Sequence, residues 1–380
     1  MRLPYVYLKK QFENPRIYLN KIEAIARRGD FTLGKEVLAF EQQAARMLGV
    51  GHVIGVGNGT DALYLILKAL GIGAGDEVIT APNSFVATAA AIALTGARPV
   101  FADVRDDYTI DPAQIKRVIT KRTKAIIPVH LTGQPADMGP IMDVARRTRL
   151  AVVEDAAQAF LARYDGKYAG TIGTAGAFSF HPLKILHVWG DGGMIATNDA
   201  LLAEHLRLWR NHGLKTRNDV EFFAHNSRLD TIHAAIASVL LPRMPGAVRK
   251  RTAIASLYDR LLSPLAGQIT IPQRNLAKRP CSHTYTNYVV MAVKRDALIG
   301  HLAKQGIEVV VQYPTPIHLQ PAALYLGYKR GGFPVCERQA DRIVTLPCNQ
   351  YMTTRDVRYV CTQINNFYTR YTDDKHSKRL

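Results

Sequence analysis

Between residue 50 and about residue 200, short apolar runs alternate with segments whose apolar residues recur at helical spacing. The runs that we expect to form strands are 53–56, 77–80, 99–103, 125–130, 150–154, 176–179 and 194–197. The segments that we expect to form helices include 62–70, 85–94, 112–119, 138–147 and 201–209. Strands that are apolar almost throughout and lie between helices are typical of a mostly parallel sheet covered on both faces. The pattern therefore predicts an α/β fold.

The segments outside this alternation predict a second, smaller unit. Residues 1–30 are polar and basic and are expected to form a lead-in helix. Residues 231–262 have the pattern of a long helical connection, interrupted by Pro242 and Pro245. A smaller α/β unit follows, with the apolar runs 288–291 and 307–311. The expected organisation is a large domain over 1–245, a small C-terminal domain over 246–370 and a frayed tail at 371–380.

Length and composition fit a cytoplasmic protein with ample core. The chain has 380 residues, and no apolar run approaches the roughly 20 residues of a transmembrane helix. The start of the chain lacks the apolar region of a signal peptide. The cysteines lie far apart, which indicates neither a zinc site nor a disulfide scaffold; they are Cys281, Cys336, Cys348 and Cys361. The sequence therefore favours a reduced, cytoplasmic setting without membrane insertion.

The net charge of +18 is the unusual feature of the composition. The basic residues are spread along the chain, with local clusters at 146–147, 207–217 and 249–251. Such a surface can bind nucleic acid, an acidic membrane or a phosphorylated substrate. We interpret most of it as solvated surface and a smaller part as a field that steers a diphosphate-bearing substrate.

An acid and a lysine mark the candidate chemistry. Asp155 follows the apolar run 150–154, and Lys184 lies in a later loop, at the end of the block Ser-Phe-His-Pro-Leu-Lys at 179–184. The glycine-rich turn 190–193 comes next. In an enzyme that uses pyridoxal 5'-phosphate (PLP), a lysine forms the Schiff base and an acid keeps the pyridinium nitrogen protonated. Taken singly, Asp155 could be a helix cap and Lys184 a surface lysine.

A phosphate cradle and a ring-stacking group precede this pair. Asn58, Gly59 and Thr60 follow the strand 53–56 and open the helix 62–70. Glycine lets backbone N–H groups approach an anion, and the start of a helix adds positive potential. Phe85 lies where the next strand meets a helix, so that its ring could stack on a cofactor ring.

In this order, the blocks resemble the sugar aminotransferases of the DegT–StrS type, within the fold-type I (aspartate-aminotransferase-like) PLP enzymes. The resemblance runs from residues 31–34 to residues 346–347. Its most specific part is the 179–184 block followed by Gly-Asp-Gly-Gly at 190–193. It implies a fold-type I PLP transferase, in which a large domain with a mostly parallel sheet is joined to a smaller C-terminal α/β domain.

The resemblance also implies roles for individual residues. Gln158 would lie near the ring hydroxyl and Ser179 on the cofactor phosphate. Asn226 would reach across a homodimer interface to the phosphate of the neighbouring subunit. His181, His187, Tyr313 and His318 become substrate candidates, although either histidine beside the lysine could equally be structural. The chain departs from the family at Asn58, where serine is commonest, and at Ile185, where asparagine is frequent.

The resemblance implies an aminotransferase with two half-reactions. An amino-acid donor, expected to be glutamate, would leave its amino group on the cofactor as pyridoxamine 5'-phosphate (PMP). A keto-sugar acceptor, linked to a nucleoside diphosphate, would then receive it in a ping-pong sequence. Lys184 and Asp155 would be the catalytic residues. The expected partners are a second copy of the chain and these two substrates, with no nucleic acid and no metal.

Several alternatives stay open or are weakened by particular residues. A PLP-dependent sugar dehydratase carries histidine at the lysine position, which Lys184 argues against. A cyclitol or another polyhydroxy ketone could replace the sugar as acceptor. A dinucleotide oxidoreductase is disfavoured because the third glycine of Gly-x-Gly-x-x-Gly would fall at Thr60. A basic regulatory or nucleic-acid-binding protein is the non-enzyme alternative, and the sequence lacks its usual motifs.

Overall fold

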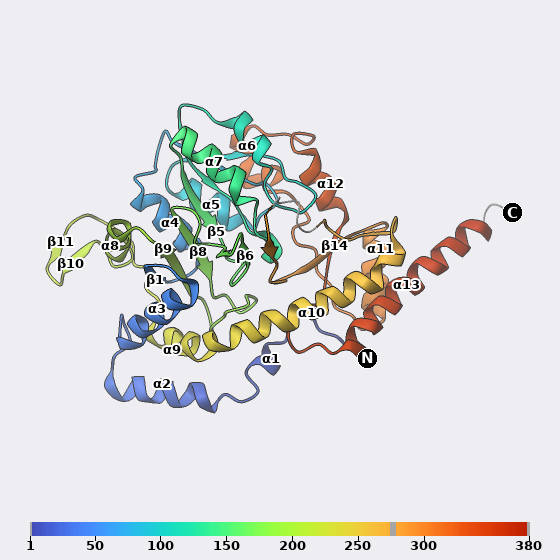
Figure 1. The fold of residues 1–380 in the computed structure, drawn as a ribbon, viewed down its shortest axis with the longest axis horizontal. Helices are drawn as coiled ribbons and strands as arrows, with labels where there is room; N and C mark the ends of the chain where they lie inside the picture. Colours follow the sequence, from blue (N-terminus) through green and yellow to red (C-terminus); the bar gives the residue numbers. More distant parts are fainter. Residues whose placement is uncertain (1, 274–278, 378–380) are drawn as a thin grey trace.

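A seven-stranded sheet forms the centre of the larger part of the molecule (Figure 1). The computed structural model describes residues 2–273 and 279–377. The strand order is β1-β9-β8-β5-β4-β2-β3, with bounds β1 His52–Val56, β9 Gly193–Thr197, β8 Ala175–Ser179, β5 Ala151–Asp155, β4 Thr123–Ile127, β2 Glu77–Thr80 and β3 Arg98–Phe101. Strands β8, β5, β4, β2 and β3 are parallel, and β9 runs antiparallel to both β8 and β1. The prediction of a mostly parallel sheet is confirmed.

Helices cover both faces of this sheet because its strands are apolar on both sides. Along β5, Val152 packs into one apolar cluster and Val153 into another. The Val153 side is closed by α4 (Gly59–Ala69), α5 (Val86–Leu94) and α8 (Ala200–Trp209). The opposite side is closed by α3 (Lys35–Leu48), α9 (Thr231–Leu240) and α7 (Met138–Thr148). Each face therefore has its own core, and the sheet itself is buried.

A three-stranded antiparallel sheet organises the smaller part of the molecule. It contains β12 (Ile269–Thr270), β14 (Tyr288–Ala292) and β15 (Ile343–Leu346). The helices α10 (Met244–Leu262), α11 (Arg295–Lys304) and α13 (Thr354–Ser377) pack with it around a separate apolar cluster. Figure 1 shows α10 running from the large sheet into this region, so that one helix ties the two parts together.

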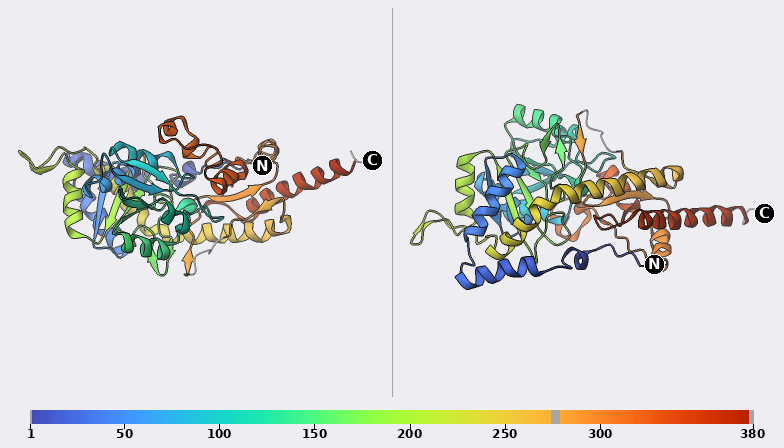
Figure 2. Two further views of the ribbon diagram at one scale, coloured as in Figure 1. Left: turned by 90° about the horizontal axis from the view of Figure 1, so that it is seen from above. Right: turned by 60° about the horizontal axis from the view of Figure 1, so that its bottom comes forward.

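Shorter elements connect or extend these two cores. The remaining helices are α1 (Leu8–Gln11), α2 (Arg16–Arg28), α6 (Pro112–Val118) and α12 (Pro334–Arg342). A second small sheet has the order β13-β6-β7, with β13 Cys281–Ser282, β6 Arg163–Tyr164 and β7 Lys167–Tyr168. The hairpin of β10 (Leu214–Thr216) and β11 (Asp219–Val220) projects from the large sheet on the side away from α13 (Figures 1 and 2).

The structure differs from the sequence expectations in four places. The lead-in is two helices, α1 and α2, and α2 buries Tyr18 and Ile25. Pro245 lies in the first turn of α10, where proline needs no N–H partner, so that the interruption is a short 3₁₀ turn at Leu241–Arg243. The run 307–311 joins its neighbours through isolated bridges. Residues 371–377 continue helix α13, and 378–380 lie outside the described residues.

The described helices include none that is both long enough and apolar enough to cross a membrane. The domain boundary at 245/246 falls at the start of α10 and stays a prediction.

Candidate active site

A cavity of about 550 Å³ lies at the carboxyl ends of the central strands. This is the edge at which open α/β sheets collect their ligands. Most of the residues singled out in the sequence line it, and they are Asn58, Gly59, Thr60, Phe85, Asp155, Gln158, Ser179, His181, Lys184 and Tyr313. They come from five separate segments of the chain, four of which the parallel topology brings to one place.

One end of the cavity is built to receive an anion. Asn58 caps α4, since its Oδ1 accepts a hydrogen bond of 2.8 Å from Asp61 N, and the first N–H groups of the helix are left for another acceptor. Gly59 packs so closely on β8 that an added Cβ would lie 2.8 Å from Cβ of Ser179. The helix start, the Thr60 hydroxyl and the Ser179 hydroxyl therefore face one small space.

Asp155 ends strand β5 and is 6% exposed. Its Oδ2 accepts a hydrogen bond of 2.7 Å from the Thr88 hydroxyl, and Ser84 lies 2.7 Å from that hydroxyl. Its Oδ1 accepts from Ala157 N at 3.2 Å. These donors fix the orientation of the carboxylate. A fixed carboxylate is suited to hold a protonated ring nitrogen.

Lys184 lies in the loop between β8 and β9, where its N–H donates to the His181 carbonyl at 2.8 Å. Burial lowers the pKa of the Lys184 ammonium, and the negative charge of Asp155 partly opposes that shift. A lowered pKa increases the fraction of neutral amine, which is the nucleophilic form. Burial and the neighbouring Lys184 also lower the pKa of His181, whose Nδ1 accepts from Leu183 N.

Gln158 connects the cavity to the smaller part of the molecule. Its Oε1 accepts from Thr132 N at 2.8 Å and from Asn287 Nδ2 at 3.2 Å. Its Nε2 donates to the Tyr313 hydroxyl at 3.2 Å, and burial raises the pKa of that phenol to about 12. The amide is therefore oriented, with its carbonyl toward the protein backbone.

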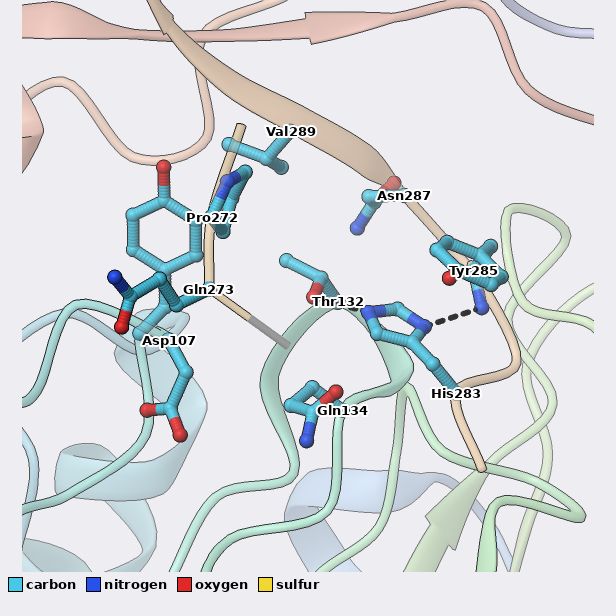
Figure 3. A pocket seen from close by; sticks show the side chains of 10 residues that line it. Asp107, Thr132, Gln134, Pro272, Gln273, His283, Tyr285, Asn287 and Val289 are labelled. Carbon is cyan, nitrogen blue, oxygen red and sulfur yellow. Dashed lines mark hydrogen bonds between the residues drawn. The ribbon is translucent and has the colours of Figure 1, made fainter. Parts of the chain in front are cut away.

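Behind Gln158, a supporting layer surrounds a hollow of about 10 Å³, which has room for roughly one water molecule (Figure 3). His283 is one of the residues that line this hollow. Its Nδ1 accepts a hydrogen bond from Tyr285 N at 2.7 Å, and its Nε2 lies 3.2 Å from the Thr132 hydroxyl. Thr132 and Asn287, which hold Gln158, face the same hollow. These contacts hold Thr132 and Asn287 in place, and both residues donate hydrogen bonds to Gln158 Oε1.

Phe85 forms the outer wall of the cavity. It is the residue before α5 and is 51% exposed, with its ring centre 5.8 Å from that of Tyr313. A half-exposed aromatic side chain at the mouth of a cavity leaves a ring face available for stacking.

The remaining predicted residues lie elsewhere. His318 is buried and its Nε2 lies 3.0 Å from Glu337, beside the ring of Phe333, so that in this chain it supports the fold. Asn226 is exposed and its backbone pairs with Asn211, outside the cavity of its own chain. His187 is buried and lines a neighbouring chamber. His130, which follows strand β4, is also buried, and its Nε2 lies 2.9 Å from Glu154 Oε2.

Several lining residues were not predicted from the sequence. Thr88 lies one helical turn beyond Phe85, and this spacing was the signal that could have found it. Tyr5 comes from the lead-in segment, and its hydroxyl donates to Asn287 Oδ1 at 2.6 Å. Thr286 and Asn287 belong to the chain leading into β14. Tertiary structure alone places these three, because no periodic pattern marks them.

The residues present fit PLP. Gly59 leaves the close approach that an added Cβ would fill, and the helix start and two hydroxyls supply donors for a phosphate. Asp155 offers a fixed carboxylate for a pyridinium, Gln158 an oriented amide for a ring hydroxyl, and Lys184 an amine of lowered pKa for an aldehyde.

Comparison with known proteins agrees with a site for PLP. The model of the DegT/DnrJ/EryC1/StrS aminotransferase family matches residues 16–365. A protein named as a pleiotropic regulatory protein, from Geobacillus stearothermophilus, is 43% identical over 97% of this chain and 99% of its own length. A dTDP-3-amino-3,4,6-trideoxy-alpha-D-glucose transaminase from Streptomyces venezuelae is 39% identical over 92% of both chains.

Solved structures share the fold. DesV from S. venezuelae, solved in complex with a ketimine intermediate, superposes with a TM-score of 0.92 at 36% identity and covers 96% of this chain and 98% of its own. NtdA from Bacillus subtilis, solved with bound PMP, gives 0.87 at 29% identity, covering 96% and 85%. The expected fold class is confirmed.

Proposed function

Because this chain belongs to the DegT/DnrJ/EryC1/StrS aminotransferase family, we propose that it moves an amino group from an amino acid to a nucleotide-linked keto-sugar. The amino donor is glutamate, and the two substrates react in turn at one cavity by a ping-pong sequence. The observation that carries the proposal is that Lys184 and Asp155, from different segments, line one cavity together with an anion cradle.

The residues divide the work by position. Bound PLP supplies an electron sink for the carbanion that forms at the donor Cα. Asp155, held by Thr88, keeps the ring nitrogen protonated. Gly59, Thr60 and Ser179 hold the phosphate, with Asn226 of the partner subunit in a homodimer, and Gln158 orients the ring hydroxyl. Lys184 carries the cofactor and, once its amine is released, moves the proton between the donor Cα and the cofactor C4'.

The acceptor is the open part of the proposal. Relatives include transaminases named for dTDP- and UDP-linked sugars, and the net charge of +18 suits a diphosphate-bearing substrate. Tyr313 at the mouth and His181 beside Lys184 are the side chains placed to contact it. A cyclitol remains an alternative acceptor, since it presents the same ketone and hydroxyl groups.

The test is spectroscopic. The purified protein should carry an absorbance band from bound PLP, and L-glutamate should convert that band to that of PMP. A panel of nucleotide keto-sugars, with a keto-cyclitol beside them, should then restore it, and the compound that does so identifies the acceptor class. Salt-sensitive DNA binding without the PLP band would instead favour the regulatory role that the name of the G. stearothermophilus relative suggests.

The cytoplasm remains the proposed location.

A further inference from the structure

A second chamber, of about 60 Å³, adjoins the main cavity behind Tyr5. Tyr5, Leu183, Lys184 and Thr286 line both spaces. We refer to it as the rear chamber, and its polar lining includes Tyr5, Tyr7, Lys184, His187, Arg251 and Asn349. Its volume is several times the roughly 10–15 Å³ that one water molecule needs. It therefore has room for a small polar group of a substrate that reacts at Lys184.

Arg251 makes the rear chamber cationic. The residue is 8% exposed, on the buried side of α10. Its Nη1 donates to the carbonyls of Tyr285 and Cys348 at 3.0 and 2.8 Å, and its Nε donates to Gln350 Oε1 at 3.1 Å. These acceptors are neutral. Burial lowers the pKa of the Arg251 guanidinium, and Cys348, Tyr5 and Tyr351 oppose that shift. Among the described residues, no carboxylate forms an ion pair with Arg251.

His187 adds a buried polar atom without a partner. Its Nδ1 lies 3.0 Å from the Lys184 carbonyl and 3.1 Å from the Ile185 carbonyl, so that this nitrogen carries a proton. Its Nε2 has no hydrogen-bond partner among the described residues, although the side chain is buried. Buried polar atoms are nearly always paired, and this unprotonated nitrogen is an acceptor, so that a ligand with a hydrogen-bond donor, such as an amino acid, suits the chamber.

We infer that the rear chamber binds a carboxylate of the amino-acid donor, with Arg251 as its ligand. A guanidinium matches a carboxylate in both charge and geometry, and it is fixed here by its other hydrogen bonds before any ligand arrives. Lys184 lines the same chamber, so that an amino acid anchored there has its Cα near the amine that takes the proton. The inference rests on the proposed function and adds the donor site to it.

Glutamate has two carboxylates, and Arg251 can bind either of them. If the chamber holds the α-carboxylate, every α-amino acid donor depends on it. If it holds the side-chain carboxylate, glutamate depends on it and L-alanine does not. Measuring the apparent Kd of L-glutamate and of L-alanine in parallel distinguishes the α-carboxylate from the side-chain carboxylate.

The test begins with the wild-type holoenzyme, because a failure to convert PLP to PMP with L-glutamate contradicts the proposed function and not the chamber. The variants are Arg251→Gln and Arg251→Lys. Lys250→Gln, on the exposed side of the same helix, is the matched control. In Arg251→Gln, we expect the apparent Kd for L-glutamate in the first half-reaction to rise about 10- to 100-fold, since a charged hydrogen bond is lost. The concentration dependence of the keto-sugar in the second half-reaction should stay unchanged.

A binding measurement provides a readout besides turnover. Glutarate has both carboxylates but no amine, so that it should raise the Tm of the wild type and of Lys250→Gln but not that of Arg251→Gln. An unchanged Kd for both amino acids in a folded Arg251→Gln overturns the inference, as does an equal loss in the two half-reactions. If Arg251→Gln does not fold, Arg251→Lys decides by the same criteria, because it keeps a long side chain in the chamber wall but loses the paired N–H donors of the guanidinium.

Discussion

Lys184 has the environment that its proposed chemistry requires, since burial lowers the pKa of its ammonium while its position in a loop leaves the amine facing the cavity. Borohydride reduction followed by peptide mapping should place the pyridoxyl group on Lys184. Lys184→Ala should fold and still bind PLP through the phosphate cradle, yet turn over about 10²-fold more slowly or worse, because no general acid–base remains at the donor Cα. A label on another lysine would overturn the assignment.

The carboxylate of Asp155 is oriented by Thr88, and the two can be tested together. Asp155→Asn should slow the first half-reaction with glutamate by about 10²-fold or more, because an amide provides no negative charge for the ring nitrogen. Thr88→Val removes the 2.7 Å hydrogen bond to Oδ2 and should have a smaller effect, with a changed spectrum of bound PLP. Thr88→Ser keeps the hydroxyl and should restore both. Near wild-type conversion by Asp155→Asn would exclude the role of this carboxylate.

At the scale of elements, the start of α4 depends on its contact with strand β8. Gly59→Ala places a methyl group 2.8 Å from Cβ of Ser179, so that the helix must shift away from the strand. We expect a loss of about 1–3 kcal/mol in the free energy of unfolding and weaker retention of PLP in dialysis. Gly300→Ala, inside α11 with nothing within 4 Å of the added Cβ, is the control and should stabilise the protein by about 0.5–1 kcal/mol. Equal PLP retention in the two variants would show that Gly59 has no part in the cradle.

The sequence predicts the large sheet well because its strands, apart from the edge strand β3, are buried on both sides. An apolar run between turn residues then has few alternatives, and all seven expected strands form within a few residues of their predicted bounds. The run 307–311 is equally apolar, but it follows helix α11 and meets the edge of a small sheet, where it pairs through single bridges. An apolar pattern indicates burial and does not say whether a neighbouring strand is available.

The residues of the site also differ in how well the sequence predicts them. Gly59, Asp155, Ser179 and Lys184 could be predicted because each belongs to a strand end or to a distinctive block, and the topology brings them together. Tyr5, Asn287 and Arg251 could not, because each reaches the site from a segment whose own pattern is that of an ordinary helix or loop. In the segment 313–318, the prediction of a cavity position holds for Tyr313 and not for His318. Tyr313 lines the cavity, whereas His318 is buried next to Glu337.

At the scale of the whole molecule, we expect a second copy of the chain to complete the proposed active site. Asn226 is exposed and lies outside its own cavity, and nearby Phe223, beyond the projecting hairpin β10–β11, is 98% exposed. A fully exposed phenyl ring is costly in water and favours burial in an interface. We predict a two-fold symmetric homodimer. Removal of PLP should lower its Tm or loosen it, because a ligand clamped by both chains stabilises the assembled form.

Sedimentation and dialysis can check this assembly. Asn226→Ala should weaken PLP retention, and Phe223→Ser should shift the sedimentation equilibrium toward monomer. A fully active species that sediments at monomer mass would contradict the prediction, as would a crystal structure in which Asn226 points away from every cofactor.

The separation of Asn226 from its own cavity has a genetic consequence. Suppose that one allele encodes Lys184→Ala and another encodes Asn226→Ala, and that each alone gives an inactive protein. In a mixed dimer, one site receives both defects and the other receives neither. Random pairing of equal amounts should therefore rebuild about a quarter of the native sites. Two non-functional copies of this chain, expressed together, would complement each other, whereas a cell carrying either copy alone would not be rescued.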